Sequence, residues 1–207
     1  MPASNPYAFF VPGLLIQLGL FGAAFVGFTI IADWRAGVIE RFRVTPVSRM
    51  ALLAGRVLRD VLTLTVQAIV LVLGGLAFGL RAPLPGVLIA LCFVAVVAVS
   101  LSALSYTVGL VLKSEDALAP LINMIVVPLM LLSGIMLPMT LGPRWLQDAA
   151  KLTPFGYIIT AMRQVFAGKY LTTVVLQGVT VSLGMAVVCL WLAGRAFAKE
   201  NACPGAA

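Results

Sequence analysis

The sequence predicts an all-α, polytopic helical membrane protein, and three observations lead to this fold class. Hydrophobic residues make up 62% of the 207 positions and charged residues only 10%. A soluble domain carries roughly 25% charged residues, which cover its surface. The apolar residues also fall in runs that match the roughly 20 residues a helix needs to cross a bilayer. Within these runs apolar and polar residues do not alternate, as they would in the strands of a membrane β-barrel.

Five apolar stretches are predicted to cross the membrane as helices within a single transmembrane domain, residues 1–207. They cover approximately residues 10–32, 58–80, 86–112, 117–137 and 174–196. Pro120 would lie in the first turn of the fourth helix, where a missing N–H group costs little. Pro128 would lie in its middle and is expected to kink it.

The lysines and arginines predict which way the chain crosses the membrane. With five spans, nine of the 14 basic residues fall on one side and five on the other. Cytoplasmic loops carry the excess of basic residues, so the side with nine is predicted to be cytoplasmic. This places the N-terminus outside and the C-terminus inside. Because the first basic residue is Arg35, no basic region precedes the first helix, which is expected to be retained rather than cleaved as a signal peptide.

Six of the nine basic residues lie in residues 33–60, around a loop predicted at residues 33–57. Trp34, Val38 and Phe42 recur every four positions, which predicts a short amphipathic helix at the membrane surface. Pro46 is expected to end it. Two interpretations stay open, a basic anchor that fixes topology and a docking element for a cytoplasmic partner protein. Glu40 slightly favours docking, because an anchor gains nothing from an acidic residue.

Residues 138–170 are too polar for an ordinary span and too apolar for a free loop. Trp145 and Tyr157 suit a membrane–water interface. A re-entrant or surface-lying helical pair on the outer face is predicted here, and plain interfacial packing is the equal alternative.

Small residues at four-residue intervals predict positions where helix backbones approach closely. They are Gly19, Ala23, Gly27, Gly75, Gly79, Ser105 and Gly109. Three amides also fall within the predicted spans, namely Gln17, Gln67 and Asn123. Each is expected to bond a neighbouring helix, and lining a substrate path is the alternative.

Several classes of function are disfavoured by what the sequence lacks. It has no histidine and no phosphate-binding loop of the pattern G-x-x-x-x-G-K-[ST]. The three cysteines, Cys92, Cys189 and Cys203, have no metal-binding or disulfide spacing. Acidic residues are expected only in loops, so no carboxylate relay should run through the spans. We therefore expect no catalytic residue, no metal and no cofactor on this chain. The net charge of +7 is assigned to topology and anionic lipid headgroups, not to nucleic acid.

Four segments are distinctive when taken together and in order. They are VPGLLIQ at residues 11–17, DWRAGVIERFRVTPVSR at residues 33–49 followed by LLAGR at 52–56, LSGIMLP at 132–138, and TPFGY at 153–157 with AMR at 161–163. This combination resembles the type-2 ATP-binding-cassette (ABC) transporter permeases, and most closely the daunorubicin-resistance-like drug exporters among them. The resemblance covers nearly the whole chain.

The resemblance implies a bacterial inner (plasma) membrane permease that pairs with a second permease copy and with separate ATPase subunits. ATP and Mg²⁺ would bind the partner ATPase. The implied coupling residues are Gly37, Glu40, Arg41, Phe42, Arg43, Pro46 and Arg49. The cargo would be a hydrophobic or amphipathic molecule, drug-like or lipid-like. Family members usually carry one additional span before the first one found here, so the alternative function is a truncated, non-transporting remnant or membrane anchor.

Overall fold

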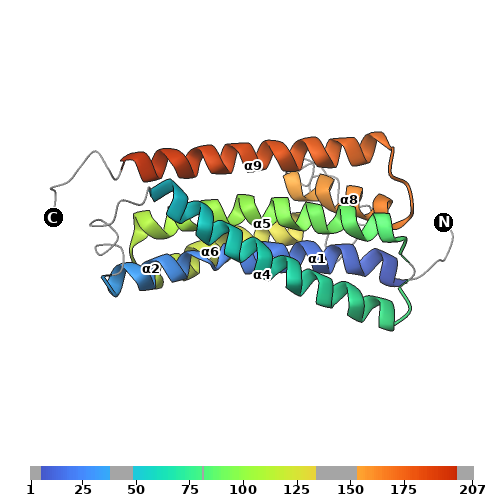
Figure 1. Ribbon diagram of the computed structural model, residues 1–207, viewed down its shortest axis with the longest axis horizontal. Coiled ribbons are helices and arrows are strands. Elements are labelled where there is room, and N and C mark those ends of the chain that lie inside the picture. The colour runs from blue at the N-terminus through green and yellow to red at the C-terminus, as the bar shows by residue number, and fades with distance from the viewer. Residues whose placement is uncertain (1–5, 38–48, 81, 134–152, 200–207) are drawn as a thin grey trace.

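The computed structural model describes residues 6–37, 49–80, 82–133 and 153–199, and in these ranges its regular secondary structure is entirely helical. The helices are α1 (Pro6–Ala24), α2 (Gly27–Arg35), α4 (Arg49–Ala77), α5 (Leu84–Leu112), α6 (Glu115–Leu132), α8 (Pro154–Phe166) and α9 (Thr173–Lys199). They lie side by side in an elongated bundle (Figure 1). Five helical stretches in the described ranges are long and apolar enough to cross a membrane, with α1 and α2 together forming the first. The predicted fold class is therefore confirmed.

The central helix is α5, which packs against α1, α2, α4, α8 and α9. A helix that is apolar around its whole circumference is stable only when neighbours surround it. Phe93, Val94, Val97 and Tyr106 are accordingly buried along α5. By contrast, α6 packs lightly, and only Leu118, Ile122 and Val126 are buried along it.

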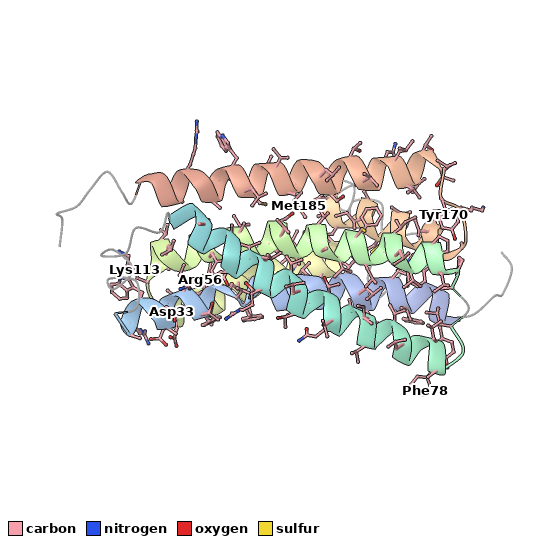
Figure 2. The ribbon with its side chains drawn as sticks, in the orientation of Figure 1. Asp33, Arg56, Phe78, Lys113, Tyr170 and Met185 are labelled. Atoms are coloured by element: carbon pink, nitrogen blue, oxygen red, sulfur yellow. The ribbon has the colours of Figure 1, made fainter. Side chains whose placement is uncertain are left out.

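The two ends of the bundle collect different segments (Figure 1). The start of α1, the α4–α5 connection and the α8–α9 connection lie at one end. The end of α2, the start of α4, the α5–α6 turn and the end of α9 lie at the other. Figure 2 shows Asp33 and Lys113 at this second end, with Phe78 and Tyr170 at the first. We call the second end the basic end, because Arg35, Arg56, Lys113 and Arg195 lie toward it.

Helix α4 begins well before its predicted start, and helix α6 begins slightly before its own. Helix α4 begins at Arg49 instead of at residue 58, because residues 49–57 are rich in Leu, Ala and Arg, which favour helix even where the segment is too polar to lie in a membrane. Helix α6 begins at Glu115, and Glu115 and Asp116 in its first turn complement the helix dipole. Its predicted end at residue 137 lies outside the described residues.

Helix α8 lies in the described part, residues 153–170, of the segment predicted at residues 138–170. It is a short helix beside α9 (Figure 1), and it also packs against α5 and α1. Phe155, Ile158, Met162 and Val165 form its buried face. In the same helix, burial lowers the pKa of Arg163 from its ordinary value. Residues 134–152 lie outside the described residues.

Candidate functional site

The last turn of α2 is bonded to the start of α4 by a short ion pair. Nη1 of Arg56 lies 2.7 Å from Oδ2 of Asp33, and Figure 2 shows both residues near the basic end. The side chain of Arg56 is only 17% exposed and that of Asp33 is 38% exposed. A short charge-assisted hydrogen bond in partial burial is stronger than an exposed pair. This contact therefore ties together the two helices that flank residues 38–48.

Two weaker contacts join the same turn of α2 to other elements. Nη1 of Arg35 lies 3.4 Å from Oε1 of Glu115 at the start of α6. Nζ of Lys113, in the α5–α6 turn, lies 5.5 Å from the ring centroid of Trp34. The side chains of Arg35 and Glu115 are 51% and 39% exposed, so solvent screens this pair and it contributes about 1 kcal/mol or less. These contacts position the end of α2 without locking it.

An acidic side chain is buried further along α4. Asp60 lies inside the candidate span Ala54–Ala77 and is only 7% exposed. The hydroxyl of Tyr106, a fully buried residue of α5, donates a hydrogen bond of 2.5 Å to Oδ2 of Asp60. Nη2 of Arg59 lies 3.4 Å from its Oδ1. The expectation that acidic residues occur only in loops is therefore wrong for Asp60, because an apolar run with one acidic residue near its edge still folds as helix.

Ser105, the residue before Tyr106, bonds to the first span where that span is interrupted. The backbone N–H of Gly27 donates to Oγ of Ser105 at 2.9 Å, and Oγ donates to the carbonyl oxygen of Ala24. The N–H of Phe28 bonds three residues back, to Phe25, at 3.2 Å, instead of four residues back to Ala24. A side chain inserted into the hydrogen-bond ladder is a known cause of a helix break. It accounts for the division between α1 and α2.

Six of the seven predicted packing residues lie against another element of the bundle. Gly27, Ser105 and Gly109 come together, and a Cβ atom on Gly27 would lie 2.6 Å from the carbonyl oxygen of Ser105. Gly19 packs against Val94 and Val97 of α5, while Ala23 is buried with Leu64 and Ala98. Gly75 packs against Val11 and Leu80.

Gly79 differs from this expectation because it lies after the end of α4. It has a φ angle of +99°, and no atom of another element lies within 4 Å of where its Cβ would be. The N–H of Leu80 bonds to the carbonyl oxygen of Gly75 at 2.9 Å, as in a helix end closed by a left-handed glycine. Gly79 therefore ends a helix and does not pack one.

The three amides are spread over three helices. Gln17 of α1 is half-buried, while Gln67 of α4 and Asn123 of α6 are exposed. Nδ2 of Asn123 donates to the carbonyl oxygen of Ala119 at 2.9 Å, so it bonds its own helix and not a neighbouring one. Among the described residues no hydrogen bond joins any two of these amides.

Only the edges of the predicted coupling segment are described. Gly37 follows the end of α2 with a φ angle of +67°, a left-handed conformation that favours glycine. Arg49 is the first residue of α4. The other predicted coupling residues, which lie outside the described residues, are Glu40, Arg41, Phe42, Arg43 and Pro46.

Comparisons with known proteins agree with the membrane architecture. The family model of the ABC-2 type transporters matches residues 2–167. The chain is 29% identical over 196 residues to a daunorubicin resistance ABC transporter permease protein of Streptomyces coeruleorubidus, covering 94% of this chain and 69% of that protein. It is 23% identical over 182 residues to a probable doxorubicin resistance ABC transporter permease protein of Mycobacterium tuberculosis, covering 86% of this chain and 65% of that protein. No solved structure matches the chain significantly. Because the family model matches most of the sequence, the chain belongs to the ABC-2 type transporter family.

Proposed function

We propose that the chain is the membrane-spanning subunit of an ATP-driven exporter in a bacterial plasma membrane. A separate ATPase subunit would bind the basic end, and a second permease copy would complete the transporter. The proposal includes a cytoplasmic basic end, with the N-terminus outside. The chain has no phosphate-binding loop of its own, so ATP would be hydrolysed by the partner.

The proposal rests mainly on the ion pair that joins the two helices on either side of residues 38–48. These residues connect α2 to α4, and the Asp33–Arg56 ion pair holds these two helices together just inside the connection. A segment that only fixes topology needs positive charge but no ion pair between its flanking helices. A segment that receives force from a partner needs both of its ends attached to the helices that must move.

The relatives suggest the chemistry of the cargo. Their names describe resistance to daunorubicin and doxorubicin, which are flat, amphipathic amines. We propose that this chain moves molecules of the same amphipathic kind, and that daunorubicin is the first probe to use.

Substitutions in the connection test docking against anchoring. The chain is co-expressed with the separate ATPase subunit that this proposal requires, purified in detergent and reconstituted in liposomes. Glu40→Lys reverses the only acidic charge in residues 38–48. If that charge meets the ATPase, losing the contact costs about 2–5 kcal/mol, or about 30-fold or more in affinity. We expect this variant to insert normally, to lose the ATPase during purification and to stop exporting daunorubicin.

Asp116→Lys is the matched control, because it reverses an acidic residue at the same end of the bundle but in the first turn of α6. It should retain the ATPase. Gly37→Pro tests the shape of the segment independently of charge, because proline cannot adopt the left-handed conformation found there. If Glu40→Lys and Gly37→Pro both keep the ATPase and full export, residues 38–48 are a topological anchor and the coupling assignment is wrong.

A further inference from the structure

Two consecutive residues of α5, Ser105 and Tyr106, form hydrogen bonds to two different helical segments. Ser105 bonds to the backbone on both sides of the α1–α2 break, and Tyr106 bonds to Asp60 of α4. Both side chains are buried. One turn of α5 is thus attached to α4 and to the first span at the same depth.

Between these hydrogen bonds and residues 38–48, the helices α2 and α4 are joined to each other. Helix α2 is separated from α1 by the break, and the Asp33–Arg56 pair joins it to α4. Arg56 and Asp60 are four residues apart on α4, so they lie on one face of that helix. The inner face of α4 therefore bonds first to α2 and then, one turn deeper, to α5.

Stability alone is a weak reason for the Asp60–Tyr106 contact. An acidic side chain inside a membrane bundle is costly, and such residues usually serve a function. Replacing a buried charged contact by apolar residues of similar volume is often neutral or stabilising. Stability alone is also a weak reason for the break between α1 and α2, because non-helical backbone at membrane depth needs hydrogen-bond partners from a neighbouring helix. Ser105 provides those partners, while an uninterrupted helix would need none.

We infer that Ser105, Tyr106 and Asp60 are positioning residues that carry a displacement of α2 into the bundle. Helix α2 turns about the break at Phe25–Val26, with Ser105 as the fixed point. The Asp60–Tyr106 hydrogen bond makes α4 move with α5 when α2 is displaced. This inference rests on the proposed function, because the displacement comes from the ATPase.

A double substitution separates this role from a purely structural one. Tyr106→Phe removes only the hydroxyl and leaves the buried Asp60 with the longer 3.4 Å contact to Arg59 alone. Asp60→Leu combined with Tyr106→Phe removes both polar groups, and should restore the melting temperature that the single variant loses. Coupling should remain lost in both, so we expect daunorubicin moved per ATP hydrolysed to fall about tenfold or more. Tyr157→Phe, at a partly exposed tyrosine of α8, is the matched control and should change neither quantity.

A second measurement follows the break directly and does not depend on the cargo. Spin labels replace Leu14 of α1 and Ala32 of α2, both exposed, in a chain whose native cysteines are changed to alanine. These positions lie about 27 Å apart at a rise of 1.5 Å per residue. In the full complex the distance should change between the nucleotide-free and ATP-bound states. Ser105→Ala should reduce or abolish that change.

The outcomes separate the inference from the proposed function. If the double variant regains both stability and transport per ATP, the contact is structural and the inference is overturned. It is also overturned if Tyr106→Phe transports normally, or if nucleotide leaves the label distance unchanged while the complex still exports daunorubicin. If the unsubstituted chain neither binds the ATPase nor exports, the proposed function fails and the inference fails with it.

Discussion

At Gly27 and Gly109 the backbones of α2 and α5 approach so closely that a methyl group does not fit. A Cβ atom on Gly109 would lie 2.7 Å from the carbonyl oxygen of Gly27. The recurrence of small residues every four positions predicts that such positions pack. It does not predict that Ser105 bonds the broken first span or that Asp60 meets Tyr106. Periodicity identifies the face of a helix, whereas these partners lie dozens of residues apart and depend on how the helices are arranged.

Gly109→Ala should destabilise the protein, because the obstructing atom belongs to backbone that cannot rotate away. Overpacking of this kind typically costs about 1–3 kcal/mol, which should appear as a lower melting temperature in detergent. Gly184→Ala in α9 is the matched control, since nothing lies within 4 Å of its Cβ position. Equal melting temperatures for the two variants would show that α2 and α5 are not in close contact.

The helices were easier to predict than their ends and interruptions. Five apolar runs identify the candidate spans because burial in lipid requires about 20 apolar residues. Hydropathy does not predict the early start of α4 at Arg49, because it detects the apolar part of a helix and not a polar extension beyond the membrane. The break after Ala24 is not predictable from the local sequence for another reason. Its cause is a side chain of α5, and the local sequence around residues 25–26 is as apolar as the helix on either side.

The attachment of α2 to α4 can be tested by cross-linking. In a chain whose native cysteines are replaced by alanine, Asp33→Cys combined with Arg56→Cys should be joined by a short bifunctional thiol cross-linker, because the 2.7 Å ion pair brings the two positions within the reach of one arginine side chain. Cysteines at Asp33 and Val66 should not, because Val66 lies about 15 Å further along α4 at 1.5 Å per residue. Similar cross-linking yields for both pairs would contradict this arrangement of α2 against α4.

At the scale of the whole molecule, one end of the bundle is basic and carries the connection between α2 and α4. How the lysines and arginines divide between the two ends depends only on where the chain crosses the membrane. The sequence could therefore predict which segments share an end. The described helices agree, placing Asp33 and Lys113 at one end and Phe78 and Tyr170 at the other (Figure 2). Which end faces the cytoplasm is a property of the cell and needs a separate measurement.

Labelling from one side of the membrane decides the orientation. In a chain without native cysteines, Ala36→Cys lies at the basic end and Leu171→Cys at the opposite end, where Leu171 is 97% exposed. We expect an impermeant maleimide added to intact cells to label the cysteine at 171 and not the one at 36. Permeabilised cells should show both labelled, which verifies that each site is reactive. Labelling of position 36 alone in intact cells would reverse the proposed topology.

The buried contact between Asp60 and Tyr106 also constrains biosynthesis. Helix α4 leaves the ribosome before α5, so Asp60 would enter the lipid before the Tyr106 hydroxyl is available, and an acidic residue inside a span is costly to insert. Only a short connection separates Ala77 from Leu84. The two helices can therefore leave the translocon together as a hairpin, with the carboxylate already hydrogen-bonded. Insertion of α4 should then depend on the sequence that follows it.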